Sequence, residues 1–198
     1  MPANKTFRLT TIAIFIALLI VQTFIPNVGY LRIIPALPSV TTIPLTVAVC
    51  ASLFGPGMGA LMGLTWGVLS LIVAYTQPFD PVSLMLFQNP LIAILPRLAA
   101  GWLAGYFANP HKKWQPVAAG LTASLVNSAG VILLTSLLFM SKTSWFAHYL
   151  GHVPAGSPLI VMLLIALGGN AIVEAIFTGV LTPLIVMPLR RVLAKVGS

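Results

Sequence analysis

The sequence predicts an all-α integral membrane protein, a six-transmembrane-helix bundle with both termini cytoplasmic. Composition is the first reason: of 198 residues, 59% are hydrophobic and 6% are charged, whereas about 25% of residues are charged in soluble domains. The second reason is that the apolar residues fall in long runs, and each membrane-spanning helix needs about 20 of them. Six such runs and their connections occupy nearly the whole chain, so we expect a single membrane domain over residues 1–198.

The apolar runs give the expected spans, at residues 9–25, 42–54, 58–75, 90–107, 116–140 and 159–188. The first run is too long for a cleaved signal peptide, and no small-residue cleavage site follows it. The second run is short and is flanked by prolines, a pattern typical of half-buried or re-entrant segments. We count it as a span because the charge distribution is then consistent.

The basic residues predict the orientation. With six spans, one face of the membrane carries Lys5, Arg8, Lys112, Lys113, Arg190, Arg191 and Lys195, and the other carries only Arg32 and Lys142. Lys and Arg collect on the cytoplasmic side of membrane proteins, so both termini are expected in the cytoplasm. The excess of basic residues therefore follows from membrane topology, and nucleic-acid binding is not expected.

The connections on the two faces differ in length. Those predicted to be extracellular, residues 26–41, 76–88 and 141–158, are long and contain proline, aromatic and histidine residues, whereas the cytoplasmic turns at 55–57 and 109–115 are short. Long connections in a compact protein are usually functional, as lids or binding loops. This asymmetry indicates that a ligand is captured from outside the cell.

Small residues recur at four-residue spacing in three of the spans. The third span carries Gly55, Gly59, Gly63 and Gly67, and the fourth carries Gly101 and Gly105. Such spacing lets a neighbouring helix backbone approach closely, and we expect these glycines to serve packing within the chain. Ala13 and Ala17 show the same spacing on the first span, where it would suit an interface with a partner helix.

Arg97 and Glu174 are the two charged residues inside long apolar stretches. An isolated charge costs at least ~2.5–3.5 kcal/mol at mid-bilayer, so each marks a candidate site. Arg97 follows Pro96, which frees a backbone carbonyl about one turn earlier, near Ile92 or Ala93. Two interpretations stay open: Arg97 forms an internal ion pair with Glu174, or it binds the anionic group of a ligand.

Polar residues at similar depth extend this candidate site. Asn170 precedes Glu174 by four residues and therefore shares its helix face. Asn127 lies near the middle of the fifth span beside Ser124, and Trp66 lies in the third span. These side chains either form hydrogen bonds between helices or surround a small polar ligand.

Several kinds of function are not expected, because their motifs are missing from the sequence. No Gly-rich phosphate loop with Lys-Ser/Thr is present, so the chain is not expected to hydrolyse ATP alone. No nucleophile stands beside a base, which argues against an enzyme. The histidines have no accompanying cysteine or carboxylate, so neither a metal site nor a cofactor is expected.

Four segments carry a family resemblance: Pro38-Ser-Val-Thr-Thr-Ile-Pro44, Leu53-Phe-Gly-Pro-Gly-Met-Gly-Ala60, Asn89-Pro-Leu-Ile-Ala-Ile-Leu-Pro-Arg97, and Asn170 to Glu174 followed by Thr182-Pro183. With the six short spans, the basic tail, Ala13 and Ala17, they resemble the substrate-binding S component of an energy-coupling factor (ECF) vitamin transporter. The third and fourth segments resemble the pantothenate-type branch. Pro44 departs from the pattern, in which a histidine follows the Thr-rich segment.

The resemblance implies a protein that binds a vitamin tightly from outside and topples in the membrane. A separate transmembrane coupling protein and two cytoplasmic ATPases would supply the energy, and Ala13 and Ala17 would dock on the coupling protein. For pantothenate, Arg97 would bind the carboxylate and Trp66 would pack on the dimethyl group. Asn127 and Asn170 would bind the hydroxyls and the amide, and Asn89 belongs to the same signature.

Two alternatives remain at this point. One is an S component for a cationic or neutral ring vitamin, such as hydroxymethylpyrimidine, thiamine or pyridoxine, with Glu174 as the counter-ion of the ligand. The other is a structural membrane protein without a ligand, in which Arg97 and Glu174 pair with each other. A carboxylate ligand requires Arg97 and a cationic one requires Glu174, so mutation separates the two vitamin classes.

Overall fold

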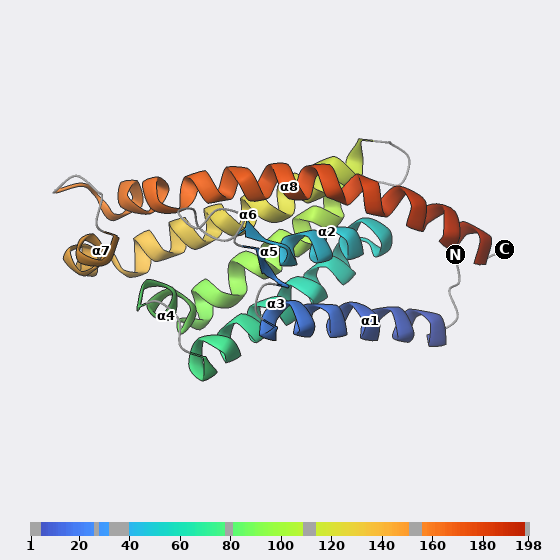
Figure 1. Cartoon of the computed structure of the whole chain (residues 1–198), viewed down its shortest axis with the longest axis horizontal. Coiled ribbons are helices and arrows are strands. Elements are labelled where there is room, and N and C mark those ends of the chain that lie inside the picture. Colours follow the sequence, from blue (N-terminus) through green and yellow to red (C-terminus); the bar gives the residue numbers. More distant parts are fainter. Residues whose placement is uncertain are drawn as a thin grey trace.

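The computed structural model describes residues 5–25, 28–31, 40–77, 81–108, 114–150 and 156–196. The elements in chain order are α1 (Lys5–Phe24), β1 (Tyr30–Leu31), β2 (Val40–Thr41), α2 (Ile43–Phe54), α3 (Pro56–Thr76), α4 (Pro81–Phe87), α5 (Pro90–Phe107), α6 (Gln115–Leu138), the 3-10 turn η1 (Met140–Lys142), α7 (Thr143–Leu150) and α8 (Leu159–Val196). They form an elongated helical bundle. In Figure 1, α1 begins and α8 ends at one end of the bundle, and α4 and α7 lie at the other.

The long helices follow the six predicted apolar runs. Four of them, α3, α5, α6 and α8, are long and apolar enough to cross a membrane. The apolar part of α1, Leu9–Phe24, and the whole of α2 are shorter. α8 continues past the predicted end at residue 188 as far as Val196. The structure thus shows an all-α membrane protein, and the count of six crossings stays a prediction.

Proline and glycine set the helix boundaries. Proline stands in the first turn of α2, α3, α5 and α6, where its missing N–H costs no helical hydrogen bond and its fixed φ suits the helix. Between α2 and α3, Gly55 has a φ of +86°, a conformation that L side chains rarely adopt. These two residue types turn the chain from α2 into α3 within a single residue.

The long connections contain short elements that the apolar pattern does not predict. β1 and β2 form an antiparallel pair in which Tyr30 is opposite Thr41. The second connection contains α4, and the third contains η1 and α7. Several residues singled out in the sequence lie outside the described part of the chain: Arg32, Pro38, Lys112 and Lys113.

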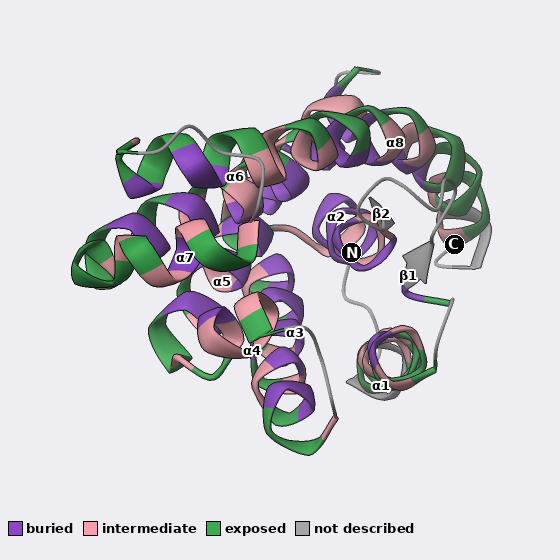
Figure 2. Cartoon of the chain, turned by 60° about the vertical axis from the view of Figure 1, so that its left-hand side comes forward, coloured by how far each residue is buried: buried purple, intermediate pink, exposed green. Residues whose placement is uncertain are grey.

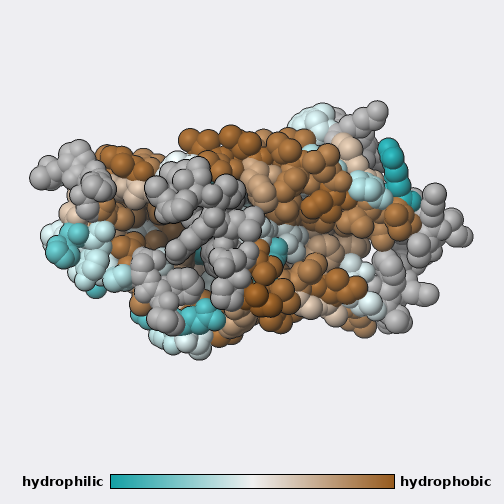
Figure 3. All heavy atoms as spheres, in the orientation of Figure 1, coloured by the Kyte–Doolittle hydropathy of each residue, from teal (hydrophilic) through white to brown (hydrophobic). Residues whose placement is uncertain are grey.

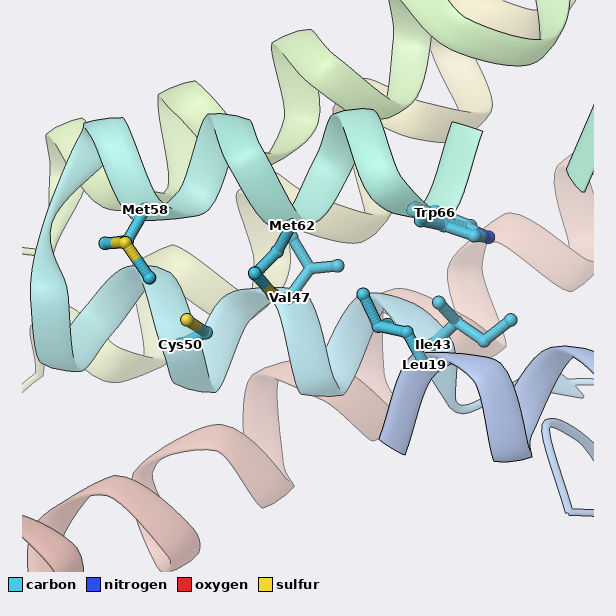
Figure 4. Close-up of a cluster of buried hydrophobic side chains, with 7 residues drawn as sticks. All are labelled: Leu19, Ile43, Val47, Cys50, Met58, Met62 and Trp66. Atoms are coloured by element: carbon cyan, nitrogen blue, oxygen red, sulfur yellow. The ribbon is translucent and has the colours of Figure 1, made fainter. Parts of the chain in front are cut away.

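The short helix α2 lies at the centre of the bundle, in contact with α1, α3, α5, α6 and α8, and Figure 2 shows it buried along most of its length. One side of α2 packs against α1 and α3 through the cluster drawn in Figure 4: Leu19, Ile43, Val47, Cys50, Met58, Met62 and Trp66. On another side, alanines of α2, α5 and α6 form a second cluster: Ala48, Ala51, Ala104, Ala108, Ala119 and Ala123. At the end of α2, the Arg190 guanidinium donates to the Ser52 carbonyl at 2.9 Å, a favourable place for a cation.

The exterior of the bundle is apolar between two more polar ends, as the face shown in Figure 3 illustrates. Large exposed aromatic residues stand near those ends: Tyr106 and Trp114 where α5 meets α6, and Tyr75 and Tyr149 at the opposite end. Trp and Tyr are enriched at membrane–water interfaces. The distribution of apolar and aromatic side chains therefore fits a protein that lies across a bilayer.

Candidate ligand-binding site

Arg97 is held inside the bundle by a carbonyl of its own helix. Its side chain is 4% exposed, and Nη1 donates to the Ile92 carbonyl oxygen at 2.6 Å. Residue 96 is proline and cannot donate to this carbonyl, which lies four residues earlier. The prediction of a freed carbonyl near Ile92 is thus confirmed, and its donor is the guanidinium of Arg97.

Two aromatic rings flank the guanidinium. The Arg97 Cζ atom lies 5.2 Å from the ring centroid of Trp66 on α3 and 4.5 Å from that of Phe87 at the end of α4. A cation over an aromatic face within about 6 Å is attracted by the ring quadrupole. The structure therefore brings together Arg97 and Trp66, which the sequence analysis named, and adds Phe87, which it missed. The only signal for Phe87 was an aromatic residue in a long connection.

The glycines of α3 position Arg97 by letting α5 pack closely. A Cβ added to Gly63 would collide with the Arg97 carbonyl, and one added to Gly67 would lie 2.8 Å from the Ile94 Cα. Gly59 and Gly101 likewise lie against each other's carbonyls. The predicted close packing is confirmed for the four-residue-spaced glycines within α3 and α5 but is wrong for Gly55, where an added Cβ would meet nothing within 4 Å and the positive φ is what requires glycine. The close packing sets the depth at which Arg97 stands opposite α3.

Glu174 on α8 is bound from across the bundle. Its side chain is 3% exposed, and Oε1 accepts from the Thr41 backbone N–H at 2.7 Å and from the Thr41 hydroxyl at 2.6 Å. Asn170 precedes Glu174 by one turn of α8, and the positive charge of Arg97 attracts the same carboxylate. Asn170 and Glu174 thus share a face, as predicted. Thr41 is a residue whose role sequence reasoning missed, although it lies in the Thr-rich segment.

Asn127 on α6 lies between α5 and α8. In this part of the bundle, Gly120 of α6 lies against Thr178 of α8, and Gly130 lies against Pro96 of α5. Asn127 is one turn from Gly130, which puts it near the depth of Arg97. It is 8% exposed, and its Oδ1 finds no hydrogen-bond donor among the described residues. A buried amide oxygen without a donor carries a desolvation cost of about 1–3 kcal/mol that a ligand hydroxyl would remove.

Asn89 has a structural role at the start of α5. Its Oδ1 accepts from the Leu91 backbone N–H at 3.0 Å, which makes it the N-cap of the helix. Pro44, which stands where a histidine was expected, is buried in the first turn of α2. A contact between Asn89 and a ligand stays a prediction.

The assembled groups are suited to binding a small polar ligand. A guanidinium, a carboxylate and amides surround an otherwise apolar interior. No group of three or more metal-ligating side chains occurs among the described residues. Polar groups of both charges among apolar side chains can fix the orientation of a small polar ligand.

Comparison with known proteins decides the family. The model of the family "ECF transporter, substrate-specific component" matches residues 7–189. The chain belongs to this family. A protein named pantothenate transporter PanT from Leuconostoc mesenteroides is 35% identical to it over 164 residues, which cover 77% of this chain and 79% of the relative. The pantothenic acid transporter PanT of Lactococcus lactis is 28% identical over 193 residues, or 89% and 96% of the two chains.

Membership confirms the predicted resemblance and defines the class of protein. An ECF S component is the substrate-binding component of a transporter, works together with an ECF module and is not an enzyme. This removes the alternative of a structural protein without a ligand. The buried polar groups described above are then candidates for the substrate site of the S component.

The predicted docking residues of this S component lie on its surface. Ala13 and Ala17 are exposed on α1, whereas Phe15, Ile16 and Leu19 of the same helix pack against the cluster of Figure 4. The small residues are therefore not used for packing within the described part of the chain, in contrast to the glycines of α3.

Proposed function

We propose that this S component binds pantothenate from outside the cell and delivers it to an ECF module for ATP-driven uptake. The two relatives named as pantothenate transporters support the choice of vitamin. The proposed ligand-binding residues are Arg97, Asn127, Asn170 and Trp66, with Asn89 and Glu174 at the edge of the site. Arg97 receives the carboxylate, because a planar guanidinium can make two parallel hydrogen bonds to it.

The observation that carries this proposal is the division of roles between the two buried charges. Glu174 Oε1 already accepts two hydrogen bonds from Thr41, so it is poorly placed to act as the counter-ion of a cationic vitamin. The guanidinium of Arg97 lies beside Trp66, close to the depth of the Asn127 amide. Pantothenate has one carboxylate, two hydroxyls, an amide and a dimethyl group, which match a guanidinium, amide side chains and an indole.

The proposed transport cycle uses a separate module for energy. A transmembrane coupling protein and two cytoplasmic ATPases supply the ATP hydrolysis for which this chain has no motif. We propose six crossings in a single membrane domain, with both termini in the cytoplasm. The shared end of the bundle where α1 begins and α8 ends supports this. The alanine cluster packs α2 closely against α5 and α6. This packing supports a cycle in which the whole protein reorients in the membrane, rather than one in which the ligand passes through the protein.

Ligand identity tests the proposal directly. The purified chain is expected to retain pantothenate, identified by mass spectrometry of the small molecules released on denaturation. Calorimetry then compares pantothenate with panthenol, in which a primary alcohol replaces the carboxylate. We expect panthenol to bind at least tenfold more weakly, because it cannot form the charge-assisted pair with Arg97. Equal binding of the two molecules, or retention of a cationic vitamin, would refute the proposed site.

A further inference from the structure

Gln22 joins α1 to the start of α2 through both ends of its amide. Its Nε2 donates to the Thr42 hydroxyl at 3.1 Å, and its Oε1 accepts from the Thr46 hydroxyl at 2.8 Å. Helix α1 also packs against α2 and α3 through apolar side chains such as Leu19. Two directed hydrogen bonds thus fix the rotation of α1 about its own axis, which apolar packing alone specifies weakly.

The chain segment that follows α1 is tied to the same point. The Thr42 hydroxyl donates to the Val28 carbonyl at 3.1 Å, and the Thr42 N–H donates to the Gly29 carbonyl at 2.8 Å. Gly29 itself lies so close to the backbone of Gln22 that a Cβ there would collide with the Gln22 carbonyl. Thr42 therefore connects the end of α1, the approach to β1 and the first turn of α2.

Thr41, the neighbour of Thr42, points the opposite way, to the candidate ligand site. Its N–H and hydroxyl bind Glu174, and the positive charge of Arg97 attracts this carboxylate. A continuous set of polar contacts therefore runs from α8 through Thr41 and Thr42 to Gln22 on α1. Residues far apart in the sequence are linked at the N-terminus of α2.

We infer that Gln22 and Thr41 are positioning residues that couple the ligand site to the rotation of α1 about its own axis. On α1, Gln22 is nine residues from Ala13, about half a helical turn in phase, so Ala13 faces the opposite way. Fixing Gln22 inward fixes the outward direction of the proposed docking face. A change at the site that shifts Glu174 therefore changes the rotation of α1. By linkage, if ligand binding changes the affinity of α1 for a partner by some factor, binding of that partner changes the ligand affinity by the same factor. This inference rests on the proposed function for the ligand used below.

Hydrogen exchange of the purified, unliganded full chain in nanodiscs tests the coupling without any ligand. Gln22→Met breaks the link at α1, and Glu174→Gln weakens it at the far end. Both are expected to raise exchange severalfold at the amides of residues 21–25 and 28–31. Thr23→Val is the matched control, because among the described residues the Thr23 hydroxyl bonds only to the Leu19 carbonyl of its own helix. If Glu174→Gln raises exchange only in α8 and at Thr41, the inference is overturned.

Pantothenate affinity provides a second measurement. We expect Gln22→Met to weaken binding about three- to tenfold, the loss typical of one or two hydrogen bonds. The Gln22→Met, Glu174→Gln double variant should bind no more weakly than the weaker single variant, because both changes break one chain of contacts. Additive losses would refute the coupling.

If Gln22→Met folds poorly, Thr46→Val takes its place in the experiment. This variant removes only one partner of Gln22 and should give the same pattern with a smaller loss of affinity. Failure of wild-type chain to bind pantothenate would refute the proposed function, while the exchange result would still decide the coupling.

Discussion

Arg97 shows how a residue that cannot lose its charge is stabilised within an apolar bundle. Pro96 leaves the Ile92 carbonyl without its helical donor, the guanidinium donates to that carbonyl, and the rings of Trp66 and Phe87 lie close to its Cζ atom. A local defect in helical hydrogen bonding and a buried cation thereby satisfy each other. The arrangement keeps the guanidinium plane oriented before ligand arrives, which lowers the cost of ordering it on binding.

Truncation of Arg97 is the sharpest residue-level prediction. Arg97→Ala is expected to weaken pantothenate binding by about 2–5 kcal/mol, as for removal of one partner of a buried charge pair. Arg97→Lys should recover only part of the loss, because an ammonium lacks the planar fork. Calorimetry on the purified variants measures both. Arg191→Ala, an exposed arginine near the end of α8, is the control and should bind as wild type does.

Glu174→Gln separates the two classes of vitamin. For an anionic ligand we expect a smaller loss than for Arg97→Ala, since the amide retains an oxygen that can accept from Thr41. A cationic ligand would invert this order. Unchanged affinity in correctly folded Arg97→Ala would show that the carboxylate is bound elsewhere.

At this scale, sequence reasoning found contacts that are local and missed those that are not. The bond from Arg97 to Ile92 follows from a proline and a five-residue separation, both readable in the chain. The contact of Thr41 with Glu174 joins residues 133 positions apart, and no spacing rule encodes it. The same holds for Phe87, whose position over Arg97 depends on how α4 folds back toward α5.

The packing of α3 against α5 depends on glycine at positions where the two backbones touch. Gly63→Ala is expected to lower stability by about 1–3 kcal/mol, because the new methyl group would meet the Arg97 carbonyl and force the helices apart. The thermal unfolding midpoint in detergent measures this. Gly57→Ala in the same helix is the control, because a Cβ there meets nothing within 4 Å. Equal effects of the two changes would contradict the role assigned to Gly63.

Helix α1 carries the proposed docking face. Replacing Ala13 and Ala17 together with Leu should abolish uptake while leaving pantothenate affinity unchanged, since added bulk blocks close approach of a partner helix. Uptake into cells or proteoliposomes containing the ECF module is compared with calorimetry on the isolated chain. Ala129→Leu, at another exposed alanine on α6, controls for bulk on the lipid-facing surface. Uptake that survives the double change would show that α1 docks by another face, or not at all.

The helices were predictable where they are long and the short elements were not. A run of about 20 apolar residues has few alternatives in a bilayer, so the positions of α3, α5, α6 and α8 follow from composition. α4, α7 and the β1–β2 pair are short and mixed in polarity, so neither length nor period distinguishes them from a connecting loop. Their positions depend on the bundle ends against which they pack.

For the whole molecule, the orientation in the membrane is the open prediction. Single cysteines introduced at Lys195 and at Lys142, in a background without the buried Cys50, report on the two ends of the bundle. We expect a membrane-impermeant thiol reagent to label position 142 in intact cells and position 195 only after permeabilisation. Labelling of position 195 from outside would show that the C-terminus is extracellular and that the proposed topology is wrong.

Unequal helix lengths around one bundle have a consequence for the surrounding lipid. α8 has 38 residues and is about 57 Å long, whereas the apolar part of α1, Leu9–Phe24, spans only about 24 Å. Against a hydrocarbon core of about 30 Å, α8 has to tilt or protrude, and α1 leaves a deficit that thins the bilayer beside it. This hydrophobic mismatch costs fractions of a kcal/mol per Å and promotes helix association. A partner that covers α1 would remove the strained lipid, so association with the ECF module should strengthen as lipid chains lengthen from 14 to about 20 carbons, measured by co-purification from proteoliposomes.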